Sequence, residues 1–227
     1  MKTLKWLFVV LLITSSVGCL GMLVPEETKM AAEGRYLEMG KYLEVEGKDQ
    51  SSLKTQKLYY LCTSYARLKE YNKLFPCLEQ LESNIAKGDN IVDMLIEVSA
   101  TPSILRAEVY IDFGNYPAAV EQATKAVTMM QELDLKDRHE FYRRTQLVQA
   151  LSALALSQAL MGERAKAEEN VRLVGEVSHF MNVPLKTIKL NGQARVYMAL
   201  GDFSKSLATI KEDEGDAWFR AYQRIAF

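Results

Sequence analysis

Apolar side chains recur every three or four positions along most of the chain after Pro25, which is the spacing of one face of an α-helix. No long run alternates apolar and polar residues as a half-buried strand would. Prolines suited to the first turn of a helix stand at positions 102, 117 and 184, and glycines suited to ending one stand at 114, 162 and 201. The pattern therefore predicts an all-α fold built from successive helix pairs.

One order of residues occurs more than once: a small residue, an aromatic, a turn residue, a second aromatic and a second small residue. The clearest copy consists of Ala107, Tyr110, Gly114, Tyr116 and Ala119, and the next clearest of Ala194, Tyr197, Gly201, Phe203 and Ser206. Weaker copies are centred on Lys69 and Gly162, and Tyr36, Gly40 and Tyr42 read as a fragment of another. Self-similarity of this kind indicates a repeat architecture.

The segments "AEVYIDFGNYPAAVEQATKA" and "ARVYMALGDFSKSLATI" resemble tetratricopeptide repeats, which are helix–turn–helix units of about 34 residues. The small residues let two helices approach closely, the aromatics fill the space beside them, and the glycine makes the turn. The resemblance implies an α-solenoid of stacked antiparallel helix hairpins over residues 51–212, preceded by a helical lead-in with a partial repeat at 20–50. A C-terminal helix at 213–227, read as an incomplete cap, would follow.

The predicted turns are spaced more widely than the family repeat. Positions 69, 114, 162 and 201 lie 45, 48 and 39 residues apart. We expect longer helices or linkers to absorb the excess at 88–100 and 131–146.

The first nineteen residues, "MKTLKWLFVVLLITSSVGC", have a basic start, an apolar block and small residues before a cysteine. This is the layout of a secretory signal. The last four residues resemble a bacterial lipobox, although Ser16 stands where that motif prefers Leu. We expect 1–19 to be a signal peptide with Cys19 lipidated; ordinary signal-peptidase cleavage and an uncleaved N-terminal anchor remain the alternatives.

Cys62 and Cys77 form an even pair fifteen residues apart. Because free cysteine is often a small buried hydrophobe, we expect two thiols in a helical core. A disulfide is the alternative if the two Cα atoms lie within about 7 Å.

Composition and motifs give no sign of catalysis. The formal net charge is −1, so no overall field favours nucleic acid. His139 and His179 lie in charged or helix-end contexts, and the chain has no glycine-rich phosphate loop, zinc-ligand spacing or nucleophile elbow. We therefore expect no enzymatic activity, no metal or cofactor, and no nucleic-acid partner.

Binding is the function that the resemblance implies, on the concave face lined by the first helix of each repeat. By pattern, the candidate groove residues are Tyr59, Thr63, Ile104, Glu108, Ile111, Ser152, Leu156, Asn191, Arg195 and Met198. Some family members hold a C-terminal carboxylate with Lys, Asn and Arg at set places. Tyr59, Thr63, Leu105, Gln149 and Ala153 stand at the matching places, so that mode is not expected.

The sequence thus favours a lipid-anchored adaptor of the bacterial cell envelope that binds another protein or peptide, located at the outer membrane if the cell is Gram-negative. A periplasmic or secreted protein follows from the other signal interpretations. The alternative function is the regulatory repeat portion of a larger or truncated enzyme, such as a caspase-like (CHAT-type) peptidase. The apolar segment "GDAWFRAYQRIAF" would suit an interrupted chain or a homodimer contact.

Overall fold

The computed structural model describes residues 25–47, 53–92, 96–133, 140–178 and 183–213, and within these ranges the fold is all-α apart from one short strand ladder. The segments 1–19, with Cys19, and 214–227 lie outside the described residues. The elements are α2 (Glu26–Ala32), α3 (Tyr36–Glu46), α4 (Thr55–Arg67), α5 (Tyr71–Ala86), β1 (Ile91–Val92), β2 (Ile96–Glu97), α6 (Thr101–Asp112), α7 (Tyr116–Glu132), α8 (Glu140–Leu160), α9 (Arg164–Ser178), α10 (Val183–Ala199) and α11 (Phe203–Asp213).

Five of the helix pairs are joined by turns of the same geometry. The turn residue has a left-handed φ in each: Gly34 (71°), Lys69 (58°), Gly114 (72°), Gly162 (79°) and Gly201 (77°). The next residue donates its N–H to a carbonyl five positions earlier, at 2.8–2.9 Å, in the pairs Arg35–Met30, Glu70–Tyr65, Asn115–Tyr110, Glu163–Gln158 and Asp202–Tyr197. This bond satisfies a carbonyl that the end of a helix would otherwise leave unpaired.

The sequence-based assignment of the first turn was wrong. Gly40 lies inside α3, and the turn that precedes this helix is at Gly34. Gly40 is small for a different reason: a Cβ atom there would lie 2.7 Å from the Ser64 hydroxyl oxygen of α4. The glycine therefore lets α3 pack closely on α4, and the Ser64 hydroxyl donates a hydrogen bond to the Tyr36 carbonyl.

Cys62 and Cys77 form a disulfide between α4 and α5, with their Cα atoms 5.6 Å apart. The expectation of two free thiols was therefore wrong. Both cysteines are fully buried, in a core that also contains Leu58, Leu74 and Leu78. The turn at Lys69 brings the two cysteines face to face, which their separation in sequence does not reveal.

The middle of the molecule is packed around α8, which contacts α6, α7, α9 and α10. Its residues from Gln146 to Ala159 are all buried except Gln149, because neighbouring helices cover α8 on several sides. On α7, Ala119, Ala123 and Ala126 are fully buried, and their small side chains allow its neighbours to approach closely.

The two stretches expected to absorb the long spacing have different structures. The first, 88–100, contains an antiparallel ladder in which Ile91 pairs with Glu97 and Val92 with Ile96. The sequence analysis did not predict it, because two residues per strand are too few to produce an alternating pattern. The second, 131–146, includes the end of α7 and the first turns of α8, with 134–139 outside the described residues.

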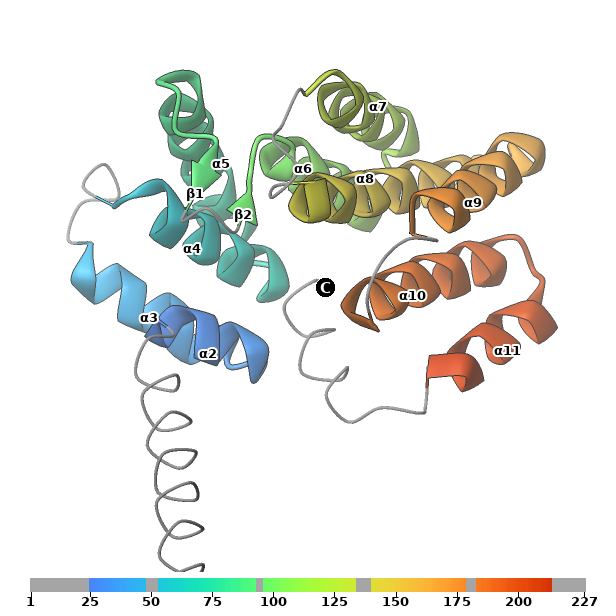
Figure 1. The fold of residues 1–227 in the computed structure, drawn as a ribbon, viewed down its shortest axis with the longest axis horizontal. Helices are drawn as coiled ribbons and strands as arrows, with labels where there is room; N and C mark the ends of the chain where they lie inside the picture. The colour runs from blue at the N-terminus through green and yellow to red at the C-terminus, as the bar shows by residue number, and fades with distance from the viewer. Residues whose placement is uncertain (1–24, 48–52, 93–95, 134–139, 179–182, 214–227) are drawn as a thin grey trace, which may run out of the picture.

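In Figure 1 the helix pairs follow an arc, with α4, α6, α8 and α10 on its inner side and α5, α7, α9 and α11 on its outer side. Within the described ranges, no helix combines the length and the apolar character needed to cross a membrane.

Candidate functional site

Adjoining hollows lie between α4, α6, α8 and α10 on the inner side of the arc, and we call this surface the inner trough. It comprises three hollows. The first is lined chiefly by Tyr59, Thr63, Arg67, Thr101, Ile104, Gln146 and Gln149; the second by Ile111, Ser152, Leu156, Gly192 and Arg195; and the third, the wide hollow, by Arg67, Lys69, Tyr71, Leu105, Val109, Asp112, Asn191 and Arg195. Glu108 lines all three, so the hollows adjoin one another.

The three hollows differ in the space they offer. The first two have volumes of about 20 and 10 Å³, whereas the wide hollow has about 330 Å³. On this measure, about 10–15 Å³ is enough for one water molecule, so each of the first two hollows holds about one water. Only the wide hollow therefore has room for side chains of another molecule.

Helical spacing explains why α4 presents polar residues to the trough. Tyr59, Thr63 and Arg67 are four residues apart and lie on one face of the helix. Leu58, Leu61, Cys62 and Tyr65 occupy the other face and are buried in the core. The packing of this apolar face therefore turns the polar face toward α6 and α8.

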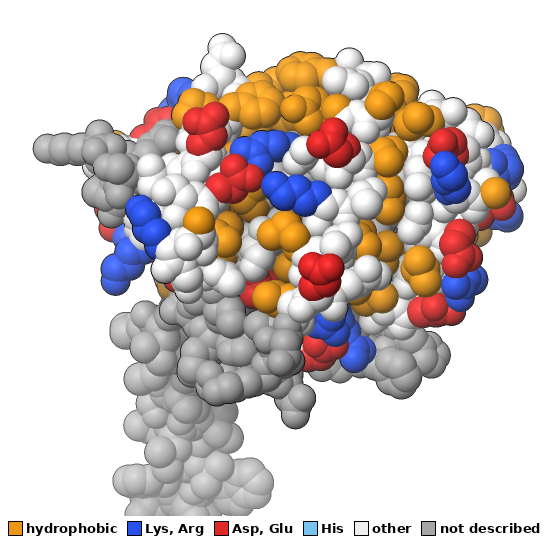
Figure 2. Space-filling model, turned by 90° about the horizontal axis from the view of Figure 1, so that it is seen from above, with side chains coloured by type: hydrophobic (Ala, Val, Ile, Leu, Met, Phe, Trp, Pro, Cys, Tyr) orange, Lys and Arg blue, Asp and Glu red, His pale blue; other side chains and the backbone are white. Residues whose placement is uncertain are grey.

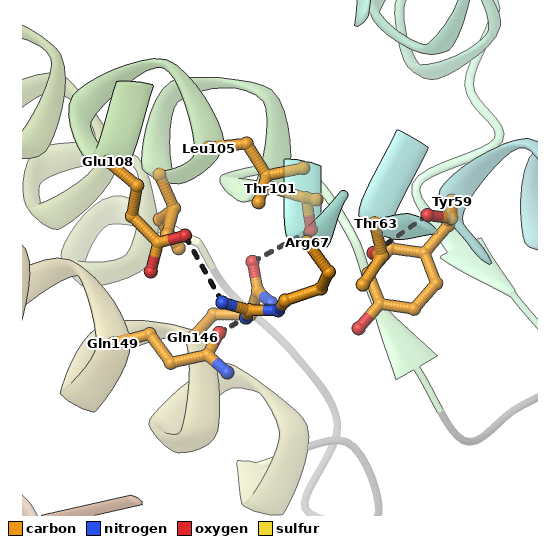
Figure 3. Close-up of a pocket in the computed structure, with 9 residues that line it drawn as sticks. Tyr59, Thr63, Arg67, Thr101, Leu105, Glu108, Gln146 and Gln149 are labelled. Carbon is orange, nitrogen blue, oxygen red and sulfur yellow. Dashed lines mark hydrogen bonds and ion pairs between the residues drawn. The ribbon is translucent and has the colours of Figure 1, made fainter. Parts of the chain in front are cut away.

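Polar side chains fill the first hollow (Figure 3). The Thr101 hydroxyl donates to the Gln146 side-chain oxygen at 3.2 Å, and the Gln146 amide donates to Gln149 at 3.3 Å. The Thr63 hydroxyl donates to the Tyr59 carbonyl at 2.9 Å. Burial raises the pKa of the Tyr59 hydroxyl, so it stays protonated near neutral pH. Of these bonds, the one from Thr101 to Gln146 joins α6 to α8.

Charged side chains cluster around the wide hollow. Arg67 lies 3.7 Å from Glu108, with its Nε buried and lacking a hydrogen-bond acceptor. Lys69 lies 3.0 Å from Asp112, which also accepts a 2.6 Å hydrogen bond from the Tyr71 hydroxyl. These pairs connect the α4–α5 hairpin to α6.

The titration of this cluster follows from its contacts. Burial alone would raise the pKa of Asp112, but hydrogen bonds from Tyr71 and Lys69 outweigh it and hold the pKa below its usual value. Burial and the neighbouring Asp112 carboxylate raise the pKa of Tyr71 to about 12. At neutral pH, Asp112 is therefore ionised and Tyr71 is a hydrogen-bond donor.

Arg195 enters the wide hollow from α10, and it also borders the second hollow. Its side chain is exposed, and it forms no ion pair with any residue of the described ranges. Its positive charge nevertheless contributes to lowering the pKa of Asp112. Among the described residues, Arg195 is thus a cation of the trough without an ionic partner.

The structure places most of the candidate groove residues along the trough. Tyr59, Thr63, Ile104 and Glu108 line the first hollow; Ile111, Ser152, Leu156 and Arg195 the second; and Asn191 the wide hollow. Met198 lines none of these hollows and is 55% exposed. Their role in binding stays a prediction.

Ser152 has a packing role that the sequence did not indicate. Its hydroxyl oxygen is buried without a hydrogen-bond partner, and a Cβ atom at Gly192 would collide with it. The backbone of α10 therefore crosses α8 directly over Ser152. We infer that this residue sets the distance between the two helices.

Sequence reasoning missed the residues that carry most of the charge in the wide hollow: Arg67, Lys69 and Asp112. Arg67 carried a usable signal, since it lies four residues after Thr63 on the same helical face. The sequence indicates Lys69 only as a turn residue, because the position of its side chain depends on how α4 and α6 pack.

Two further observations concern metal ligands and surface charge in the described residues. In the described ranges no group of His, Cys, Asp and Glu side chains is arranged to hold a metal ion. Figure 2 shows acidic and basic side chains interspersed on the face seen from above, without a large patch of one sign. His139 and His179 lie outside the described residues.

Comparison of the chain with protein-family models, with curated proteins and with solved structures finds no match.

Proposed function

We propose that this chain is a non-enzymatic interaction scaffold of the tetratricopeptide type, exported and lipid-anchored at Cys19 in a bacterial cell envelope, which holds a partner protein in its inner trough. The observation that carries the proposal is the repeated turn. Five hairpins share a left-handed turn residue and the same hydrogen bond after it. Repeated hairpins of one geometry are the building unit of an α-solenoid, whose inner face serves as an extended binding surface.

The spacing of the first two turns supports the family assignment. Gly34 and Lys69 are 35 residues apart (69 − 34 = 35), close to the repeat length of about 34 residues in tetratricopeptide proteins. The later hairpins have the same turn but contain longer helices, such as α8 with 21 residues. The trough then follows from stacking four inner helices side by side.

The disulfide between Cys62 and Cys77 supports export. Disulfides persist in oxidising compartments such as the bacterial periplasm and are rare in the reducing cytosol. This agrees with the signal-like segment 1–19, in which Cys19 is the proposed lipidation site.

The experiment is a crosslinked purification of the tagged chain from membranes of the organism that produces it, with a Cys19→Ser variant as the matched control. We expect the wild-type chain in the membrane fraction together with a defined envelope protein. We expect the variant to leave that fraction and to lose this protein. Recovery of the wild-type chain without any other protein would contradict the scaffold function. Recovery of the Cys19→Ser variant in the membrane fraction at the wild-type level would contradict the lipid anchor.

A further inference from the structure

The wide hollow contains more positive than negative charge. Its walls carry three cations, Arg67, Lys69 and Arg195, and two carboxylates, Glu108 and Asp112, so its formal charge is +1 (3 − 2 = 1). Both carboxylates already have partners, Glu108 in Arg67 and Asp112 in Lys69 and Tyr71. The excess charge therefore resides on Arg195.

The two arginines also have unused hydrogen-bonding capacity. A guanidinium has five N–H donors in a planar fork that matches a carboxylate. Arg67 lies 3.7 Å from Glu108, beyond ordinary hydrogen-bond length, and its buried Nε has no acceptor. Arg195 has no ionic partner among the described residues. The hollow thus offers two guanidinium groups from opposite walls, α4 and α10, to one space of about 330 Å³.

The remaining walls are partly apolar, beside Tyr71 and Asn191. Leu105, Val109 and Ala66 line the same hollow. The wide hollow shares Glu108 and Arg195 with the second hollow, and Arg67 with the first, so a bound segment would continue over these two narrow hollows without placing side chains in them. This continuity favours a side-chain carboxylate in the middle of a segment over a chain terminus.

We propose that the wide hollow recognises a protein segment in which an Asp or Glu side chain, flanked by apolar residues, pairs with Arg195 and Arg67. This inference rests on the proposed function, since it names the chemistry of the partner that the trough would hold. The segment's carboxylate neutralises the excess charge, and its apolar neighbours contact Leu105 and Val109. Arg67 then exchanges part of its long contact with Glu108 for a direct hydrogen bond.

The test uses the full exported chain and a phage library of random dodecapeptides, displayed so that the peptide's C-terminus is blocked. We expect the enriched peptides to contain Asp or Glu next to apolar residues. Synthetic amidated versions of these peptides should bind at least about tenfold more weakly to an Arg195→Gln variant, because charge-assisted hydrogen bonds are among the stronger ones. Their binding should also weaken as salt is raised.

Arg172→Gln is the matched control. It removes the same charge from α9, where Arg172 is 53% exposed and paired with Glu169 and Glu176. We expect this variant to bind the peptides as the wild type does. Arg195 is exposed and has no ionic partner in the described ranges, so its replacement should leave the helical circular-dichroism spectrum unchanged. An Arg67→Gln variant, checked in the same way, should also weaken binding.

The outcomes separate this inference from the proposed function. The inference would be overturned if the enriched peptides lacked acidic residues, or if acidic peptides bound the Arg195→Gln variant as tightly as the wild type. Either result would still support the trough as a peptide-binding surface. Peptides that bind only with a free C-terminus would replace the side-chain carboxylate with a terminal one. Failure to enrich any peptide would count against the trough as a binding surface, and so against both proposals.

Discussion

The hairpins α4–α5 and α6–α7 have the same turn but are held together in different ways. The second has the small residues of the repeat pattern, with Ala107 and Ala119 fully buried at the helix contact. At the equivalent places, 45 residues earlier, the first has Cys62 and Leu74, which are also fully buried. It has Lys69 in place of Gly114, yet both residues adopt a left-handed φ, of 58° and 72°.

The difference teaches that the turn geometry tolerates a lysine in place of glycine when the packing compensates. A lysine in the left-handed region is unfavourable relative to glycine. The α4–α5 hairpin adds a disulfide and a leucine-rich core to hold this turn. The α6–α7 hairpin relies on glycine and close alanine packing instead.

The largest expected effect comes from exchanging the buried residues at the equivalent positions 74 and 119. Leu74→Ala should lower the free energy of unfolding by about 2–5 kcal/mol, because it leaves a cavity. Ala119→Leu should lower it by about 1–3 kcal/mol, because it overpacks the tighter hairpin. Chemical denaturation measures both; if Ala119→Leu were neutral, the two hairpins would not differ in how closely their helices pack.

Removing the disulfide is expected to have the next largest effect. The free energy of unfolding of the Cys62→Ala/Cys77→Ala double variant should be about 3 kcal/mol lower than that of the wild type, since the disulfide closes a fifteen-residue loop and restricts the unfolded chain. Thiol reduction of the wild type should reproduce most of this loss in the same denaturation assay. Equal stability of oxidised and reduced protein would show that the first hairpin does not depend on its crosslink.

A smaller effect is expected from the turn residues. Gly114→Ala should lower the free energy of unfolding by about 1 kcal/mol. The loss should come from backbone conformation alone, because nothing lies within 4 Å of the added Cβ. Lys69→Gly should have the opposite sign and raise stability by about 0.5 kcal/mol, since it relieves the same backbone cost while losing only an exposed ion pair. Thermal melting of both variants tests the sign of each change in stability. If both variants were less stable than the wild type, the two turns would not be equivalent.

The smallest effect concerns the ionic contact between the two hairpins. The folded-state pKa of Asp112 is below its unfolded value of about 3.8, so this carboxylate stabilises the fold above that pH and loses its contribution as the pH falls through the folded pKa. The wild type should therefore lose slightly more stability than an Asp112→Asn variant on acidification below that value. Urea denaturation at pH 7 and near pH 3 gives the comparison; parallel losses would mean that Asp112 gains nothing from Lys69 and Tyr71.

Regular features of the fold were predictable from the sequence. Helical periodicity and the repeated order of small and aromatic residues located the turns at Lys69, Gly114, Gly162 and Gly201, because each depends on residues close in sequence. The turn at Gly34 was missed because the aromatics beside Gly40 suggested a different register. Gly40 is instead required by the close contact of α3 with Ser64, a residue 24 positions later.

The trough was predictable only in part, for a similar reason. Helical spacing identified Thr63, Glu108 and Arg195 as residues of the inner faces. The disulfide, the charge cluster around Asp112 and the burial of Ser152 under Gly192 all depend on how separate helices meet. Such distances are set by tertiary packing and leave little trace in the local pattern.

The central claim is that a partner protein lies in the inner trough, and site-specific photocrosslinking in the native cell tests it most directly. A photoreactive residue would replace Asn191 in the wide hollow or, as a control, Thr124 on the exposed side of the outer helix α7. The account predicts a single crosslinked protein from position 191 and none from position 124. The same adduct from both positions, or from position 124 alone, would contradict it.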